Sequence, residues 1–246
     1  MPLKQGVKNL KLNKLALVAC TALAPALLPT SAQACGTVSI TEMNWASAQV
    51  VTAVAKFIME NGYGCEVATV PSDTVPSVAS LAENNEPDIV TELWTNSTGE
   101  VFDRLLAEGK VVRSGKVIDP GGVEGWWAPT AVLGKYKMTR VRIADYDADI
   151  HSANVNADSP NSALSDFPEA PVYTVVTTDF ASREPAIAEL MSKMSFDVQV
   201  MNELVSWKDE NGATTDQTAA YFVTNYGSVW GDWLSDEAKA KLSSLL

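Results

Sequence analysis

Short apolar runs alternate with longer amphipathic stretches through the first half of the chain. Runs of buried-strand length are expected at 37–40, 66–70, 88–93 and 110–118. Helices are expected between them at 47–61, 75–83 and 99–108. The first helix places Val50, Val51, Val54, Phe57 and Ile58 on one face. This strand–helix alternation predicts an α/β fold, built on a parallel sheet with right-handed crossovers.

The second half of the chain has a different pattern. One strand-like run lies at 137–149, and the stretch 151–169 is rich in Asn, Ser, Asp and Pro, which predicts an irregular surface loop. A buried-type strand follows at 172–177, and four helices are expected at 184–194, 198–210, 215–226 and 235–245. Three tryptophans in this region have apolar neighbours and are interpreted as core residues: Trp207, Trp230 and Trp233.

The first 34 residues have the features of an export signal. Four lysines without an acid precede an apolar stretch at 15–28 that is too short for a membrane span. Ala32-Gln33-Ala34 then fits the small-x-small cleavage rule. Cleavage after Ala34 would leave 212 of the 246 residues, with no later segment apolar enough to cross a bilayer. The sequence therefore predicts a soluble protein exported to the periplasm.

Two cysteines remain after cleavage, because Cys20 leaves with the signal. Cys35 would be the first mature residue, so a lipid anchor on its thiol is one interpretation. Gln33 and Ala32 fit a lipoprotein signal poorly, since that motif prefers a small residue and a leucine at these positions. In an oxidising compartment, a Cys35–Cys65 disulfide is the favoured interpretation.

The mature chain is strongly acidic. Loss of the four lysines of the signal would take the net charge from −12 to −16. Nucleic acid is a poor match for such a surface, because neutralising phosphates requires a basic face. An acidic protein remains compatible with a cationic ligand.

Tryptophans follow two of the predicted strands. Asn44 and Trp45 come after the strand at 37–40, and Trp94 comes at the end of 88–93. The carboxyl ends of strands in open α/β sheets are where ligands bind. Trp126 and Trp127 follow Asp119-Pro-Gly-Gly122, which is interpreted as a turn between lobes. These positions give three candidate walls of one binding site.

Indole faces attract cations, and quaternary ammonium groups are their characteristic ligands. Tryptophan faces also stack on sugar rings, so carbohydrate binding stays open as an alternative. An enzyme is the weakest interpretation: the sequence contains no Gly-x-Ser-x-Gly elbow, histidine-rich metal motif or phosphate loop. A cofactor is not expected.

Several segments resemble those of a known family. They are GTVSITEMNW at 36–45, EPDIVTELW at 86–94, GVEGWW at 122–127 and WAPTAVLGKY at 127–136, and the similarity continues from APVYTVV at 170–176 to the C-terminus. They resemble the substrate-binding proteins of glycine betaine/choline/proline betaine ABC importers. The resemblance implies a periplasmic binding protein-like fold of type II, with two α/β lobes that enclose a compatible solute in an aromatic cage, and a membrane permease as partner.

The resemblance also implies roles for individual residues. Trp94 matches a cage residue of the first lobe, Trp45 matches the first ligand loop, and Trp127 matches a cage residue of the second lobe. In typical members, the GWW and WAPT motifs are far apart, whereas here they fuse at Trp126-Trp127-Ala128. The implied organisation is a first lobe at 35–122 and 172–246, with 123–171 as a remnant of the second lobe and hinge. A truncated paralogue that binds no solute is therefore another alternative.

Overall fold

The computed structural model describes residues 35–129, 138–156 and 163–246. The predicted signal peptide at 1–34 lies outside these ranges. Within them, no helix has the length and apolar character that a membrane span requires.

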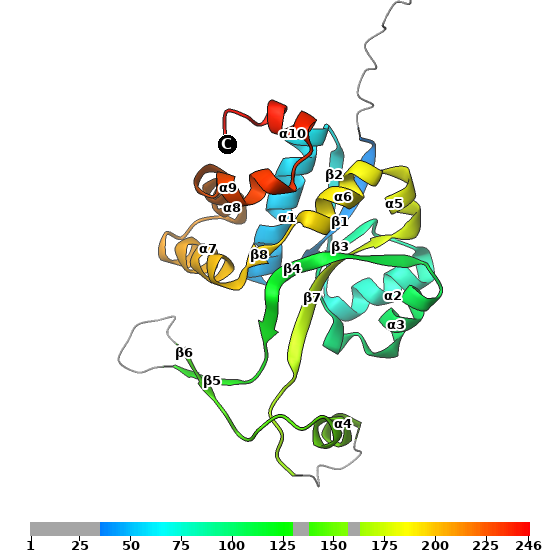
Figure 1. The fold of residues 1–246 in the computed structure, drawn as a ribbon, viewed down its shortest axis with the longest axis vertical. Coiled ribbons are helices and arrows are strands. Elements are labelled where there is room, and N and C mark those ends of the chain that lie inside the picture. Colours follow the sequence, from blue (N-terminus) through cyan, green and yellow to red (C-terminus); the bar gives the residue numbers. More distant parts are fainter. Residues whose placement is uncertain (1–34, 130–137, 157–162) are drawn as a thin grey trace, which may run out of the picture. The chain divides into compact units, whose positions relative to one another are not determined.

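Six strands form the main sheet, in the order β2-β1-β3-β7-β4-β8 (Figure 1). They are β1 (Thr37–Met43), β2 (Glu66–Ser72), β3 (Ile89–Trp94), β4 (Val111–Val123), β7 (Glu169–Thr177) and β8 (Phe196–Asp197). The predicted parallel pairing is present among the first three strands, and β1 lies between β2 and β3. The resulting unit matches the α/β pattern of the sequence.

The expectation of a parallel sheet is wrong at β7, although β4 and β8 pair in parallel at the far edge. β7 pairs antiparallel with both β3 and β4, which separates these two strands. The reason is long-range: the chain leaves the sheet at the end of β4 and returns along β7 in the opposite direction. A local hydrophobic pattern identifies a buried strand, but it does not specify which strands pair with it or whether they pair in parallel.

The predicted turn at Asp119–Gly122 is also wrong. These residues belong to β4, which continues to Val123. The pairing of β4 with β7 shifts register between Ile118, opposite Val172, and Gly122, opposite Ala170. The Pro-Gly-Gly residues therefore produce an irregularity within a long strand, because the partner strand β7 continues past them.

Most predicted helices are present with similar bounds. They are α1 (Ala46–Ile58), α2 (Thr74–Asn84), α3 (Gly99–Ala107), α6 (Pro185–Lys193), α7 (Val198–Glu210), α8 (Thr215–Asn225) and α10 (Asp236–Lys241). Two short helices were not predicted: α5 (Thr178–Arg183) and α9 (Gly227–Trp230). After α1 comes a π-helical turn, Met59–Tyr63, which ends at Gly64 with φ +74°. Glycine adopts this left-handed conformation readily, which suits it to end a helix.

The main sheet is covered on both faces. Ile89 and Val176 belong to a large apolar cluster with α1, α6, α7 and α8, whereas their neighbours Val90 and Val175 belong to a second cluster with α2 and α3. Successive residues of a strand point to opposite faces, so the two clusters lie on opposite sides of the sheet (Figure 1). β3 is therefore buried from both directions, with Trp94 as its only half-exposed residue.

A smaller sheet pairs β5 (Trp126–Pro129) antiparallel with β6 (Met138–Val141). The irregular loop expected at 151–169 is wrong in its first part, because α4 (Ala148–Asn156) covers 151–156. The Asp147 side chain caps this helix: its Oδ1 accepts the backbone N–H of Asp149 and Ile150, both at 3.0 Å. Residues 157–162 lie outside the described ranges.

The three tryptophans interpreted as core residues differ in the structure. Trp230 and Trp233 are buried. Trp207 is only half-buried: its ring stacks on Tyr221 with centroids 4.1 Å apart and borders a surface hollow of about 440 Å³. The core interpretation is therefore wrong for Trp207, because α8 covers α7 on one side only.

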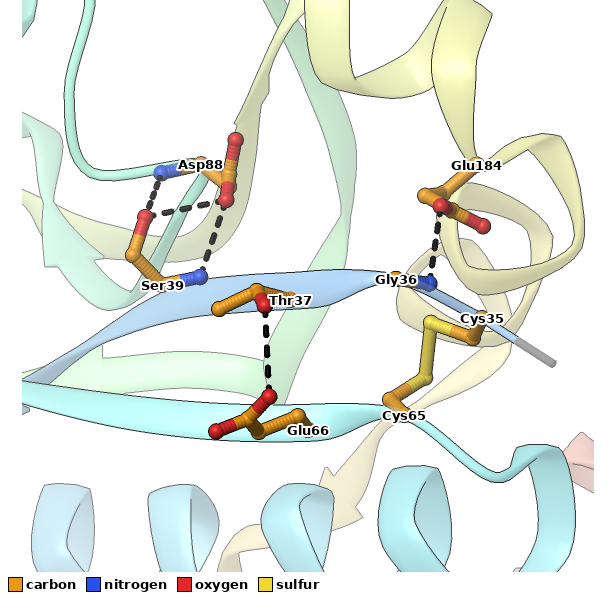
Figure 2. The surroundings of a disulfide bond; sticks show 8 residues. All are labelled: Cys35, Gly36, Thr37, Ser39, Cys65, Glu66, Asp88 and Glu184. Atoms are coloured by element: carbon orange, nitrogen blue, oxygen red, sulfur yellow. Dashed lines mark hydrogen bonds between the residues drawn. A yellow bond between two sulfur atoms is a disulfide. The ribbon is translucent and has the colours of Figure 1, made fainter.

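Cys35 and Cys65 form the disulfide that the sequence predicts (Figure 2). They precede β1 and β2, whose parallel pairing starts with Thr37 opposite Glu66. A second link lies further along β1, where Asp88 Oδ2 accepts the backbone N–H and the hydroxyl of Ser39 at 2.8 and 2.9 Å. The amino ends of β1, β2 and β3 are thus held together by one covalent bond and a carboxylate.

We expect removal of the disulfide to weaken the fold substantially. The bond closes a loop with a sequence separation of 30 residues, which corresponds to about 3–4 kcal/mol in the chain-entropy model. Urea unfolding of a Cys35→Ser/Cys65→Ser variant should show a loss of this size, and added reductant should not destabilise that variant further. Intact mass should show the native chain two hydrogens lighter than its reduced form. Two free thiols, or a diacylglyceryl mass on Cys35, would contradict the assignment.

Candidate functional site

Two of the predicted site tryptophans line one pocket. Trp45 is the N-cap residue of α1, directly after β1, and Trp94 is the last residue of β3. Thr74, the first residue of α2, and Ser97, in the short 3-10 helix Thr95–Ser97, complete the lining. The pocket holds about 260 Å³, slightly less than typical drug-sized sites, so it suits a small ligand.

The topology of the sheet explains why these residues meet. β1 pairs in parallel with both β2 and β3, so the carboxyl ends of all three strands lie at one edge. Each strand is followed there by a helix or helical turn that carries a lining residue. Ligands bind at this edge in open α/β sheets. The pocket is therefore a direct consequence of the parallel half of the sheet.

A buried glutamate lies beside the N–H edge of Trp45. Glu92 is 1 % exposed and has φ +51°, a left-handed conformation that is uncommon for residues other than glycine. The pairing of β3 with β7 gains one extra β3 residue between Val90 and Leu93. Such a bulge changes the direction of a side chain. Glu92 can thereby turn toward the start of α1 instead of following the regular alternation of the strand.

The carboxylate of Glu92 binds two residues at the start of α1. Its Oε1 accepts the indole N–H of Trp45 at 2.6 Å and the hydroxyl of Ser47 at 2.7 Å. Within the described structure, Oε2 accepts no hydrogen bond. Burial raises the pKa of Glu92, and polar contacts from Ser47, Trp45 and Trp94 oppose this rise. Of these contacts, those from Ser47 and Trp45 have full hydrogen-bond geometry. The amino end of a helix also favours a negative charge.

Trp94 packs on the backbone of β4. A Cβ atom built on Gly122 would lie 2.2 Å from Cη2 and Cζ3 of the Trp94 ring. No real Cβ contact is this short, so the indole occupies the space that a side chain at this position would need. Gly122 therefore fixes the position of one pocket wall by having no side chain.

Asn44 contacts the pocket only indirectly. Its side chain donates to Asp73 Oδ2 at 3.2 Å, and Oδ1 of Asp73 accepts the backbone N–H of Thr74 at 2.6 Å. Asn44 thus links the loop after β1 to the start of α2, beside a lining residue. A direct contact of Asn44 with a ligand stays a prediction.

Trp126 and Trp127 lie on β5, and neither lines the Trp45–Trp94 pocket. Their side chains are 63 % and 44 % exposed. Consecutive residues of a strand point to opposite faces, so at most one of the two can face a given ligand. The structure therefore brings together two of the three predicted aromatic walls.

Four residues at or beside the pocket were not predicted as site residues from the sequence: Thr74, Ser97, Glu92 and Gly122. Thr74 had a usable signal, because it follows a predicted strand and Asp73 is a good helix N-cap. Glu92 stood within an apolar strand pattern, where a buried charge is unusual, but its direction depends on the bulge. The contact of Gly122 with Trp94 is a long-range packing event. Among the described residues, no cluster of three His, Cys, Asp or Glu side chains could hold a metal ion.

Comparison with known proteins gives a family match. The model named OpuAC, described as the substrate binding domain of ABC-type glycine betaine transport systems, matches residues 36–161 and 127–225. The two matched stretches share residues 127–161. No curated protein sequence matches the chain.

Solved structures show the same fold at low sequence identity. A choline-binding protein of an ABC transporter, in complex with choline, has a TM-score of 0.62 at 16% identity, covering 86% of this chain and 99% of that one. The glycine betaine/L-proline-binding protein ProX from Borrelia burgdorferi has 0.61 at 15%, covering 84% and 99%. Lactococcal OpuAC complexed with glycine betaine has 0.56 at 13%, covering 81% and 100%.

We expect a pH-dependent stability difference between the native chain and Glu92→Gln. Burial raises the pKa of Glu92 in the folded state only, so between the unfolded and folded pKa values the folded state binds more protons. The free energy of unfolding contributed by this group therefore falls as pH rises through that window, and levels off above the folded pKa. Urea unfolding at a series of pH values should show that the free energy of unfolding of Glu92→Gln rises relative to that of the native chain across this pH window.

Glu66→Gln, at an exposed position on β2, is the matched control for loss of one acidic charge. A difference between the Glu92→Gln variant and the native chain that stays constant from acid to neutral pH would contradict a raised pKa for Glu92.

Gly122→Ala should displace Trp94, because the added methyl group and the ring cannot share the same space. Overpacking of this kind costs about 1–3 kcal/mol, measurable by urea unfolding, and near-ultraviolet circular dichroism should report the changed tryptophan environment. Gly36→Ala is the control, since its Cβ would lie at an ordinary 3.4 Å from Glu184 Oε1. An unchanged spectrum with native stability would show that β4 moves aside instead.

Proposed function

Because the chain belongs to the family of substrate-binding domains of ABC-type glycine betaine transport systems, we propose that it binds glycine betaine or a related quaternary ammonium solute for import. The observation that carries the proposal is the pocket lined by Trp45 and Trp94 at the carboxyl edge of the parallel strands. A quaternary ammonium group has no N–H to donate, so attraction to indole faces is the suitable recognition chemistry.

The size and lining of the pocket support a small cation. A volume of about 260 Å³ suits a small ligand, and the two indoles provide apolar, electron-rich surface. Thr74 and Ser97 complete the lining, and their hydroxyl groups are the candidates for contact with the polar end of a compatible solute. Two structural neighbours contain choline and glycine betaine, and these ligands are therefore the first to test here.

The setting of the protein is part of the proposal. Residues 1–34 act as a signal peptide that is cleaved after Ala34, and the mature protein works in the periplasm and delivers its solute to the membrane permease of an ABC importer. The Cys35–Cys65 disulfide supports this setting, since structural disulfides persist in oxidising compartments.

Residues 123–171 form a shortened second lobe in this proposal, and residues 35–122 and 172–246 form the first. The double match of 127–161 to the family model supports a compressed middle segment. The small β5–β6 sheet carries Trp126 and Trp127, which are the remaining candidates for a third cage wall. Because Trp127 precedes Ala-Pro-Thr as in the family motif, we assign this wall to Trp127.

Calorimetric titration should detect glycine betaine, choline or proline betaine binding to the native chain. The two indole faces that line the pocket contribute roughly 1–4 kcal/mol, the third wall assigned to Trp127 would add about 0.5–2 kcal/mol, and a millimolar Kd corresponds to about 4.1 kcal/mol. We therefore expect Kd in the millimolar range, abolished in Trp45→Ala and Trp94→Ala. Trp207→Ala is the matched control, because Trp207 lies on α7 outside the pocket. Binding of a neutral sugar with no response to quaternary ammonium ligands would favour the sugar-platform alternative, and flat titrations of a folded sample would favour a non-binding paralogue.

The contribution of the second lobe is tested separately. Trp127→Ala should weaken binding about two- to thirtyfold, the loss expected for one indole wall, while Trp126→Ala should change Kd by less than about twofold. Small-angle scattering should show little compaction on ligand addition. Micromolar affinity with clear compaction would instead show that the shortened lobe closes fully over the ligand.

A further inference from the structure

We propose that Glu92 determines the cation specificity of the Trp45–Trp94 pocket, both by fixing the Trp45 indole and by placing a carboxylate at its N–H edge. This inference rests on the proposed function, because it concerns the same pocket. Three features of Glu92 support this role: a short hydrogen bond to Trp45, a backbone conformation that allows this bond, and a carboxylate oxygen that accepts no hydrogen bond of full geometry.

The hydrogen bond sets the orientation of Trp45. An indole has a single N–H donor, and that of Trp45 points to Glu92 Oε1 at 2.6 Å. Ser47 of α1 donates to the same oxygen at 2.7 Å, so a second hydrogen bond fixes the position of the Glu92 carboxylate. With its polar edge turned inward to Glu92, the Trp45 ring lines the pocket with its apolar carbon surface. That surface is the part that attracts a cation.

The backbone at Glu92 is arranged for this contact. A left-handed residue and a strand bulge occur together at this position, and each disfavours a regular strand. Asn and Gly would adopt φ +51° more readily than Glu. A residue whose only role was to pack within the strand would not need the bulge or the left-handed backbone conformation. The strain is explained if the side chain is needed at the start of α1.

The second carboxylate oxygen of Glu92 accepts no hydrogen bond of full geometry, although Trp94 makes a weaker polar contact with the carboxylate. Oε2 is buried and accepts no hydrogen bond within the described structure, and none of the ion pairs found there includes Glu92. An uncompensated buried carboxylate is unfavourable, whereas a cation held against the face of the Trp45 ring, whose N–H edge contacts Glu92, would stabilise its charge. A neutral ligand of the same shape would not. The pocket should therefore select by charge as well as by shape.

A purely structural role makes a different prediction. If Glu92 only accepted the Trp45 N–H, then Gln would replace it fully, because an amide oxygen accepts the same hydrogen bonds. Glu92→Gln thus separates the charge from the hydrogen bond, and Glu92→Leu removes both. Glu66→Gln, at an exposed site on β2, removes the same charge at the opposite end of the parallel strands.

The experiment compares choline with its neutral carbon isostere, 3,3-dimethylbutan-1-ol, in NMR titrations of the native chain and these variants. We expect the native chain to prefer choline. Glu92→Gln should lower choline affinity on the order of tenfold, as Coulomb attraction across a few ångströms in a partly screened site predicts. Affinity for the neutral isostere should change less than about twofold, and Glu66→Gln should leave both ligands unaffected.

The positioning role has a readout that requires no ligand. Near-ultraviolet circular dichroism and tryptophan fluorescence of Glu92→Gln should match those of the native chain, because the Trp45 hydrogen bond is retained. Glu92→Leu should change both spectra, and the change should disappear in a Trp45→Phe background. Native-like spectra for Glu92→Leu would overturn the positioning role.

The outcomes separate this inference from the proposed function. If the native chain binds choline and Glu92→Gln binds it equally well, the specificity role of Glu92 is overturned while the proposed function stands. An equal loss of affinity for both ligands would also overturn it, because the effect would then be on shape. If the native chain binds no quaternary ammonium ligand, the proposed function fails and the cation-selecting role fails with it.

Discussion

The central strand β3 is buried on both faces, and the arrangement of the rest follows from this constraint. Ile89 and Val90 anchor the two apolar clusters on opposite sides of the sheet. Such a strand requires a hydrogen-bonded neighbour on each edge, which β1 and β7 provide. Its last residues are therefore held firmly where they reach the carboxyl edge of the sheet, and the site depends on this rigidity, since cation binding needs fixed aromatic faces.

β3 also joins packing to chemistry within six residues. Its first half is apolar and fixes the register, whereas its second half carries the bulge, Glu92 and Trp94. The irregularity stands next to the pocket, as bulges near functional sites often do. The return strand β7 pairs antiparallel with β3 beside the bulge and so ends the parallel series β2-β1-β3. The fold thus combines an open parallel edge for a ligand with an antiparallel half formed by the segments that lead to and from 123–171.

The position of Trp94 connects these two halves. Its ring lies on Gly122 near the end of β4, and the neighbouring Asn96 donates to Glu124 Oε1 at 2.6 Å. Thr95 donates to the carbonyl of Pro171 on β7 at 3.3 Å. The loop after β3 therefore contacts both strands that lead to 123–171. A change in the direction of these strands would therefore displace Trp94, which forms one wall of the pocket.

The sequence by itself determined the local elements and the residues able to do the chemistry. Period-3.6 patterns placed most helices within a few residues, a cysteine pair predicted its own disulfide, and Trp45 and Trp94 were selected by their places after strands. The tertiary structure alone decided that β7 lies antiparallel between β3 and β4, that Trp207 is half-exposed, and that Glu92 turns back to Trp45. The physical reason is range. Periodicity and capping act between residues a few positions apart, whereas strand order, the close approach of Gly122 to Trp94 and the direction of a bulged side chain depend on partners far away in the chain.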